Sequence, residues 1–380
     1  MEEAGGRGSE ANDGCHGGSR RASAERGAIG HGPERLTGQA LTALAPSPHR
    51  GAVATPSPLL PAGTTAWLIT DGKAGDLAPC RGLAEALGLA AEERMVAPRP
   101  PFSWLAPRGP ADPRERALHP PWPDLAIATG RRAVPALRAV KRRSRGETFT
   151  VFLRDPRIGT RAADLIWVPA HDRLRGPNVV VTDLGPHPVS PARLAAARAQ
   201  PDPRLAALPR PRAAVLVGGD SRHGRFPDED GRRLLAGLER LADEASLMIT
   251  ASRRTPGPLR AALADLARRR GGFVWDGSGE NPYLALLALA DTIVATADSA
   301  NMVTEACAAG APVLLFEPRN LYPRHRPLFE ALKSQGTVHP FAGRVEALRP
   351  KPLDMTLAIA QAVANAYIGH RDALARRTTR

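Results

Sequence analysis

A polar break inside an apolar stretch offers the strongest candidate for ligand chemistry. The stretch VATADSANMVTEACAAGAPVLLFEP, residues 294–318, is typical of a strand, a loop, a helix and a second strand. Asp298, Ser299 and Asn301 fall in the loop, where a helix start presents unpaired N–H groups and a positive dipole end to a phosphate. Glu305, on the first turns, is placed to accept both hydroxyls of a ribose. A capping box of Ser and Glu is the alternative.

Three more polar loops follow apolar runs in the second half of the chain. Glycines after a strand let the backbone approach a ligand, and adjacent arginines suit a diphosphate. An Asn-Pro step caps a helix or holds a base or ribose at its mouth. The alternative for the glycines is a tight turn between strand and helix, and for the arginines an exposed basic turn. The alternative for the Asn-Pro step is a helix cap with no ligand. Together with the stretch above, the candidate nucleotide-sugar residues are Gly218, Gly219, Ser252, Arg253, Arg254, Asn281, Asp298, Ser299, Asn301, Met302 and Glu305. Met302, like Cys307, fits packing better than chemistry.

The first half carries candidates for the acceptor side. Asp71 and Asp76 follow the first apolar run, where a carboxylate could deprotonate an acceptor hydroxyl, although Asp is also common in turns. Gly130, Arg131 and Arg132 form a candidate anion site at another strand end, and Lys73 is a further candidate on the acceptor or anion side. The pairs Arg154 with Asp155 and His171 with Asp172 end later strands. For the lone His171, a structural role is favoured over catalysis.

The elements that position these loops are short apolar runs alternating with helical patterns, which predicts parallel, helix-covered sheets. Ligands of such sheets bind at the carboxyl ends of the strands, where the polar loops lie. We therefore predict an α/β fold with two doubly wound, Rossmann-like domains that face a cleft. The expected parts are a disordered tail (1–63), an acceptor-side domain (64–200), a nucleotide-sugar domain (211–348) and a C-terminal helix packing back on the first domain (352–380).

Composition limits the classes of protein that the chain can belong to. Of its 380 residues 43% are hydrophobic and only 4% aromatic, with a net charge of +14 that comes mostly from Arg. The charge fits anionic ligands or an anionic membrane surface, and equally a solvated Arg-rich surface. Aromatic stacking platforms are lacking, so we expect no nucleic-acid partner. The three cysteines have no metal-like spacing, and the start of the chain lacks an apolar signal segment, which favours a cytoplasmic location, with peripheral contact at an inner membrane as an extension.

Two resemblances sharpen these expectations. The motif SANMVTEACAAGAPVLLFEP resembles the nucleotide-sugar motif of GT-B glycosyltransferases, in which the residue matching Glu305 binds the ribose. The five motifs TDGKAGD, GGDSRHGRF, SRRTP, WDGSGENPY and ATADSANMVTEA, in this order, resemble the mitochondrial-fission "elongated mitochondria" family, whose fold is similar to GT-B. Many relatives have His at the position of Asp76, which puts in question whether this chain keeps the family's acid–base group.

The function expected from these features is transfer of a sugar from a nucleotide-sugar, a UDP-sugar in the first instance, to an acceptor that the sequence does not name. A membrane-linked acceptor is one alternative. We expect no metal and no cofactor, since no D-x-D motif outside the predicted helix start at residues 228–230 suggests a metal-held diphosphate. The alternative, from another class, is a non-catalytic scaffold of GT-B shape that recruits a protein partner. The resemblance implies such a role, because plant members are associated with recruiting a dynamin-related GTPase to mitochondria.

Overall fold

The structure is a computed structural model that describes residues 59–378, apart from residues 222, 223 and 320. The predicted tail lies outside the described residues except for residues 59–63. All described residues belong to one compact unit, residues 40–380.

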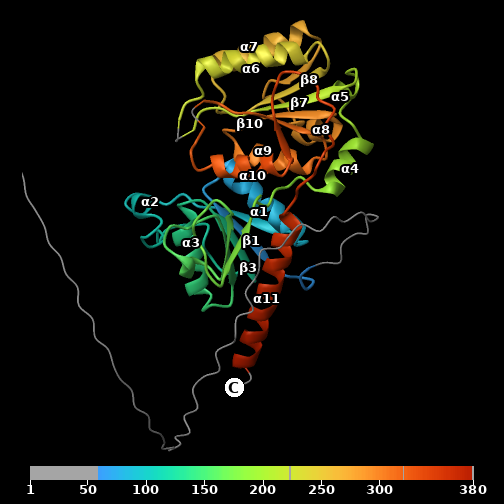
Figure 1. Ribbon diagram of the computed structural model, residues 1–380. Helices are drawn as coiled ribbons and strands as arrows, with labels where there is room; N and C mark the ends of the chain where they lie inside the picture. The colour runs from blue at the N-terminus through green and yellow to red at the C-terminus, as the bar shows by residue number, and fades with distance from the viewer. Residues whose placement is uncertain (1–58, 222–223, 320, 379–380) are drawn as a thin grey trace, which may run out of the picture. The chain divides into compact units, whose positions relative to one another are not determined.

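Two six-stranded parallel sheets organise this unit (Figure 1). The first has the strand order β2-β1-β3-β4-β5-β6 and the second β12-β11-β10-β7-β8-β9. The strands of the first sheet are β1 (Ala66–Thr70), β2 (Ala91–Met95), β3 (Leu125–Thr129), β4 (Phe149–Leu153), β5 (Leu165–Pro169) and β6 (Val179–Thr182). Those of the second are β7 (Arg212–Val217), β8 (Ser246–Ala251), β9 (Phe273–Trp275), β10 (Thr292–Thr296), β11 (Val313–Phe316) and β12 (Val338–Pro340). The predicted α/β class with two Rossmann-like sheets is confirmed.

Helices connect the strands and cover both sheets. Helices associated with the first sheet are α1 (Ala74–Ala86), α2 (Phe102–Leu105) and α3 (Ala133–Arg143), with a 3₁₀ turn at Thr160–Ala162. The crossover to the second sheet carries α4 (Pro191–Ala199) and α5 (Pro203–Ala206). Helices of the second half are α6 (Asp228–Leu241), α7 (Gly257–Arg269), α8 (Tyr283–Leu289), α9 (Ala300–Ala308), α10 (Arg326–Ser334) and α11 (Thr356–Thr378). In Figure 1, α6 and α7 cover one face of the second sheet and α8 to α10 the other.

The strands are apolar on both sides because both faces of each sheet are buried. In β1, Leu68 joins one hydrophobic cluster, while its neighbours Trp67 and Ile69 join another, as the two-residue repeat of a strand requires. In β7, Leu216 belongs to the same cluster as Leu68, and Val215 belongs to a third. One core is therefore shared by the two sheets, and each sheet has a second core on its other face.

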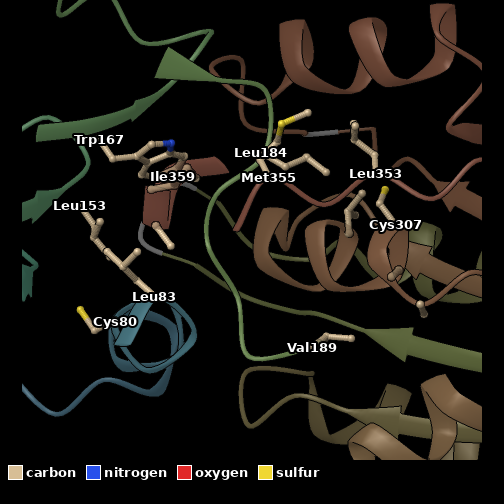
Figure 2. Packing of buried hydrophobic residues seen from close by; sticks show 14 of the residues in the cluster. Cys80, Leu83, Leu153, Trp167, Leu184, Val189, Cys307, Leu353, Met355 and Ile359 are labelled. Carbon is tan, nitrogen blue, oxygen red and sulfur yellow. The ribbon is translucent and has the colours of Figure 1, made fainter. Parts of the chain in front are cut away.

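Residues far apart in the sequence build the shared core (Figure 2). Leu83 of α1, Cys307 of α9 and Ile359 of α11 all belong to it and are almost fully buried. Two segments that run between the sheets contribute Val189 and Leu353, and the N–H of Leu353 donates to the carbonyl of Cys307 at 3.0 Å.

Helix α11 returns to the first sheet after the chain has completed the second. The Tyr367 ring meets that of Phe149 in β4 edge to face, with centroids 6.1 Å apart. Arg371 pairs with Asp124 at 2.8 Å, next to the start of β3. The last helix therefore fastens the end of the chain to the first sheet.

Three details of the second half differ from the sequence-based prediction. Strand β12, which pairs with β11, was not predicted. Helices α10 and α5 were not predicted either. These elements are three to nine residues long, too short for a hydrophobic repeat to become visible in the sequence.

Gly82 and Gly369 provide a matched pair for testing the packing of the crossover segment. A Cβ atom at Gly82, inside α1, would overlap the backbone of His187, whereas one at Gly369, inside α11, meets nothing within 4 Å. Gly369→Ala should therefore raise the free energy of unfolding by about 0.5–1 kcal/mol through helix propensity. Gly82→Ala should lower it by about 1–3 kcal/mol through overpacking. Denaturant unfolding measures both, and equal shifts would contradict the close contact between α1 and the crossover.

Candidate functional site

A cavity of about 620 Å³ opens at the carboxyl ends of the first sheet and is closed by α9 and the segment before α10. The predicted residues that line it are Asp71, Lys73, Asp76, Gly130, Arg131, Asn301 and Glu305. It thus brings the predicted acceptor residues together with two residues of the nucleotide-sugar set. Because it lies between the two sheets, it is the cleft that the fold prediction required.

Two acidic residues of the cavity, Asp71 and Asp76, lie at the point where the strand order of the first sheet reverses. In that sheet β1 lies beside β3, and the crevice between two such strands is where ligands of open α/β sheets bind. Gly130, just after β3, has a φ of 93°, and a Cβ there would lie 3.1 Å from Asp76 Oδ2 and 3.9 Å from Asp71 Oδ1. Two carboxylates therefore converge on the single position that has no side chain.

Asp71 has one carboxylate oxygen in use and one without a partner. Its side chain is only 5% exposed, and Oδ2 accepts a hydrogen bond from the Lys73 ammonium group. Oδ1 is buried and has no hydrogen-bond partner among the described residues. A buried acceptor without a donor is costly, so a ligand hydroxyl at this position would be favoured.

Glu305 faces the cavity from α9 and is held by a tyrosine. The Tyr283 hydroxyl, at the start of α8, donates to Glu305 Oε2 at 2.5 Å. Burial raises the pKa of the Glu305 carboxyl, and the hydrogen bond from Tyr283 opposes that rise. Oε1 has no hydrogen-bond partner among the described residues, so one oxygen remains for a ligand. Tyr283 was not predicted from the sequence, because nothing in its spacing points to a carboxylate on another helix.

The glycine loop of the second sheet forms a separate, hydrogen-bonded group. The N–H of Gly219 donates to Asp298 Oδ2 at 2.6 Å, and the N–H of Gly218 donates to Thr296 Oγ1 at 2.8 Å. The Arg254 guanidinium donates to the carbonyls of Gly219 and Asp220, at 3.2 and 2.6 Å. Ser252 Oγ donates to the carbonyl of Gly218 at 3.2 Å. This group fills the strand-order reversal between β7 and β10.

Asp298 already occupies the anion position of that loop. Burial raises the pKa of its carboxyl, and the hydrogen bond from Thr296, then that from the N–H of Gly219, oppose the rise. A side chain at Gly218 would overlap the Asp298 carboxylate, so glycine is required there. The sequence predicted a backbone approach to a ligand at this loop, and the described structure places a protein carboxylate at that approach instead.

The remaining predicted residues lie near α8 and α9 or on the surface. Arg253 is exposed. Asn281 Oδ1 accepts from the N–H of Tyr283 at 3.1 Å, which is the cap alternative. Ser299 is the N-cap of α9, but its side chain makes no capping hydrogen bond, so the capping-box alternative is wrong. Met302 packs against the shared core.

Asn301 joins the second sheet's α9 to two elements of the first sheet. Its Oδ1 accepts from Arg154 Nη2 at 3.0 Å, and its Nδ2 donates to the carbonyl of Gly75 at 2.8 Å. Arg154 follows β4 and Gly75 lies in the first turn of α1. The side-chain amide therefore bridges the two walls of the cavity.

Arg131 is engaged in supporting the fold. Its guanidinium donates to the carbonyls of Ser103 at 3.0 Å and Trp104 at 3.4 Å, and also to that of Ala106. This leaves the Arg131 charge directed at the α2 turn. At the predicted anion site, the Asp76 carboxylate therefore lies against Gly130. The Arg131 guanidinium is already hydrogen-bonded to backbone carbonyls.

Arg132, a member of the predicted anion site, also lines the cavity. So do Arg157, Arg324 and His325, which were given no ligand role from the sequence, and His171 faces His325 with ring centroids 6.4 Å apart. Burial lowers the pKa of His171. A rule that takes every polar residue after a strand as a candidate would have found Arg157, two residues beyond Asp155.

The fold and cavity define the class as a GT-B-like protein: two Rossmann-like sheets with a ligand-sized cleft at their carboxyl edges. Within that class, residues 74–367 match the family described as mitochondrial fission ELM1, and the chain belongs to this family. The family resemblance seen in the motifs is thereby confirmed.

Two curated proteins are similar in sequence. The mitochondrial fission protein ELM1 of Arabidopsis thaliana is 27% identical over 246 residues, 58% of this chain and 58% of that protein. An uncharacterised protein of Rickettsia prowazekii, RP120, is 27% identical over 160 residues, 40% of this chain and 45% of that protein. The chain therefore spans about half the length of the curated relatives it matches.

Solved structures with a similar fold include several enzymes. UDP-GlcNAc 2-epimerase of Neisseria meningitidis, bound to UDP-GlcNAc, has a TM-score of 0.45 and 13% identity, covering 82% of this chain and 100% of that one. Acinetobacter baumannii MurG has a TM-score of 0.40 and 14% identity, covering 81% and 95%. Arabidopsis thaliana UGT89C1, complexed with UDP, has a TM-score of 0.43 and 13% identity, covering 82% and 94%. These likenesses concern the fold.

The described residues contain neither a membrane-spanning helix nor a cluster of metal-ligating side chains. No helix between residues 59 and 378, gaps excepted, is long and apolar enough to cross a membrane. In the same part of the chain, no three His, Cys, Asp or Glu side chains gather in a way that could hold a metal ion.

The buried Glu305 carboxyl should make stability depend on pH. Because burial raises its pKa, the folded protein binds this proton more tightly than the unfolded chain does. The resulting stabilisation is present below the unfolded pKa and is lost as the pH rises through the folded pKa. Glu305→Gln should therefore gain stability relative to the wild type as the pH rises above the unfolded pKa of about 4.3, in denaturant unfolding at each pH. The exposed Glu147→Gln is the control, and the same trend in both variants would contradict the assignment.

Proposed function

We propose that the chain binds a nucleotide-sugar, most simply a UDP-sugar, in the cavity between the sheets and transfers the sugar to an acceptor hydroxyl. The observation that carries the proposal is that Glu305 and Asp71 line one cavity. They come from opposite sheets, and each has a carboxylate oxygen without a partner among the described residues. One oxygen would hold a donor hydroxyl and the other an acceptor hydroxyl.

At the donor end, α9 supplies the binding groups. Glu305 Oε1 would accept from the ribose hydroxyls while Tyr283 keeps the carboxylate in place. Ala300 and Asn301, in the first turn of α9, also line the cavity, so the positive end of the helix dipole faces it. The diphosphate would lie there, where negative charge that develops on the leaving group is stabilised.

The glycine loop would not contact the sugar. Its role would be to position α9, which does contact the ligand. Gly218, Gly219 and Arg254 are bonded to Asp298 or its neighbours and do not line the cavity. In this proposal they hold the loop between β10 and α9 in place. Arg253 is exposed and, like these residues, does not line the cavity.

At the acceptor end, Asp71 would be the general base. Its free Oδ1 would take the proton of the acceptor hydroxyl as the hydroxyl oxygen bonds to the anomeric carbon. The bond from that carbon to the diphosphate oxygen breaks, and the nucleoside diphosphate leaves with the electron pair. Asp76, beside Gly130, would hold the acceptor in place.

A second candidate function is recruitment of a protein partner, without catalysis. The observation that favours it is the exposure of large apolar side chains on the first sheet's side: Trp104 is 74% exposed and Leu105 51%. Exposed apolar side chains of this kind mark interaction surfaces. The name of the Arabidopsis relative, a mitochondrial fission protein, agrees with such a role.

Calorimetric titration with UDP and a set of UDP-sugars tests the proposal. The wild type should bind at least one of them, and Glu305→Ala should weaken binding by about tenfold or more through loss of hydrogen bonds to a charged group. Glu147→Ala, which removes an exposed carboxylate outside the cavity, should bind as the wild type does. Absence of binding at millimolar ligand by folded protein would contradict the proposal and favour the recruiting role.

Catalysis can be separated from binding at Asp71. With a UDP-sugar that binds, Asp71→Asn should reduce the transfer or hydrolysis rate by about 10²–10⁴-fold, the typical contribution of a general base. UDP affinity should change little, because Asp71 lies on the first sheet. Release of UDP measures the rate, and an unchanged rate would exclude Asp71 as the base.

A further inference from the structure

The cavity has a cationic zone that the proposed transfer does not use. Arg132 follows β3, while Arg154 and Arg157 follow β4, and all three line the cavity. Among the described residues, Arg132 and Arg157 have no hydrogen bond or ion pair from their guanidinium groups. The other two cations on this wall are engaged, Lys73 with Asp71 and Arg131 with the carbonyls of the α2 turn.

Strand order separates this zone from the acidic groups. The three arginines follow the central strands β3 and β4, whereas Asp71 follows β1 and Asp76 lies in the first turn of α1, on one side. Asp172 and Asp183 follow β5 and β6 on the other side. Asp155 lies within the zone, but its Oδ1 accepts the N–H of Arg157 at 2.7 Å and so shapes the turn. The middle of the sheet edge is therefore the place where an anion meets the least repulsion.

The backbone holds two of these arginines in an unfavourable conformation. Arg154 has a φ of 92° and Arg157 a φ of 62°, a region that side-chain-bearing residues rarely adopt. The loop is fixed at Arg154, whose N–H donates to the carbonyl of Trp167 at 2.6 Å, and Pro156 is buried. Glycine would relieve the strain if the loop had only to turn. Strain retained with a long cationic side chain is typical of a functional site.

We propose that Arg132, Arg154 and Arg157 form a phosphate subsite on the first sheet. Guanidinium groups are suited to phosphate oxygens, because their fork of donors binds two oxygens at once. If the proposed sugar transfer holds, on which this role for the site rests, the phosphate belongs either to the acceptor or to the donor's diphosphate. Arg154 already reaches Asn301 at 3.0 Å, so the subsite adjoins the α9 wall.

Titration with inorganic pyrophosphate tests the subsite directly. The wild type should bind it, and the double variant Arg132→Ala/Arg157→Ala should bind at least about tenfold more weakly, with the single variants in between. Arg142→Ala removes one positive charge, as each single variant does, but from an exposed position on α3 outside the cavity. It is the matched control for the single variants. Circular dichroism establishes that each variant is folded.

Competition with UDP identifies the source of the phosphate. If UDP displaces pyrophosphate and the double variant also binds UDP more weakly, the subsite holds the donor's diphosphate. If pyrophosphate and UDP bind at the same time and the double variant loses affinity for pyrophosphate alone, the subsite belongs to the acceptor. Both results support the subsite.

Two results would overturn it: no pyrophosphate binding at about 10 mM by folded wild type, or an equal loss in Arg142→Ala, which would mean diffuse charge attraction. UDP binding without pyrophosphate binding would leave the proposed sugar transfer intact and remove only the subsite. Pyrophosphate binding without binding of any UDP-sugar would keep the phosphate subsite and remove the proposed sugar transfer.

Discussion

The apolar core that the two sheets share is the constraint on which the rest of this protein depends. Leu68 of β1 and Leu216 of β7 belong to one buried cluster, together with side chains of α1, α9 and α11. Because close-packed interiors do not deform continuously, such a core fixes the faces it joins. The carboxyl edge of the first sheet is thereby held against α9, and Asn301 completes the contact by bonding to Arg154 and Gly75. Without that core, Glu305 and Asp71 would have no common cavity.

The cavity that results is divided by chemistry. One Asp71 oxygen without a partner among the described residues lies where the strand order of the first sheet reverses, and Glu305 lines the same cavity from α9, while arginines follow the central strands. The strand-order reversal of the second sheet, the usual ligand position of such folds, is taken up by the protein's own Asp298. Binding would therefore concentrate on α9 and the first sheet. A protein that only recruits partners has no need for buried oxygens without donors, which are costly to maintain.

The sequence predicted most of the fold and part of the site. Apolar runs such as residues 125–129 and 292–296 were visible because strands buried on both faces need no polar alternation. Short elements such as β12 and α5 were missed, since three or four residues carry no periodicity. Asp71 and Asp76, chosen because they come after the first strand, line one cavity together with Glu305 of the helix that follows β10. Which polar groups satisfy one another could not be predicted, because Tyr283 with Glu305, or Gly219 with Asp298, depends on helices and loops meeting in space.

A crystal structure of the protein with UDP bound would show whether the cavity between the sheets holds the nucleotide. We expect the nucleotide in that cavity, with a ribose hydroxyl about 2.5–3.0 Å from Glu305 Oε1 and the diphosphate at the start of α9. A nucleotide bound outside this cavity, or a ribose out of hydrogen-bond reach of Glu305, would contradict it.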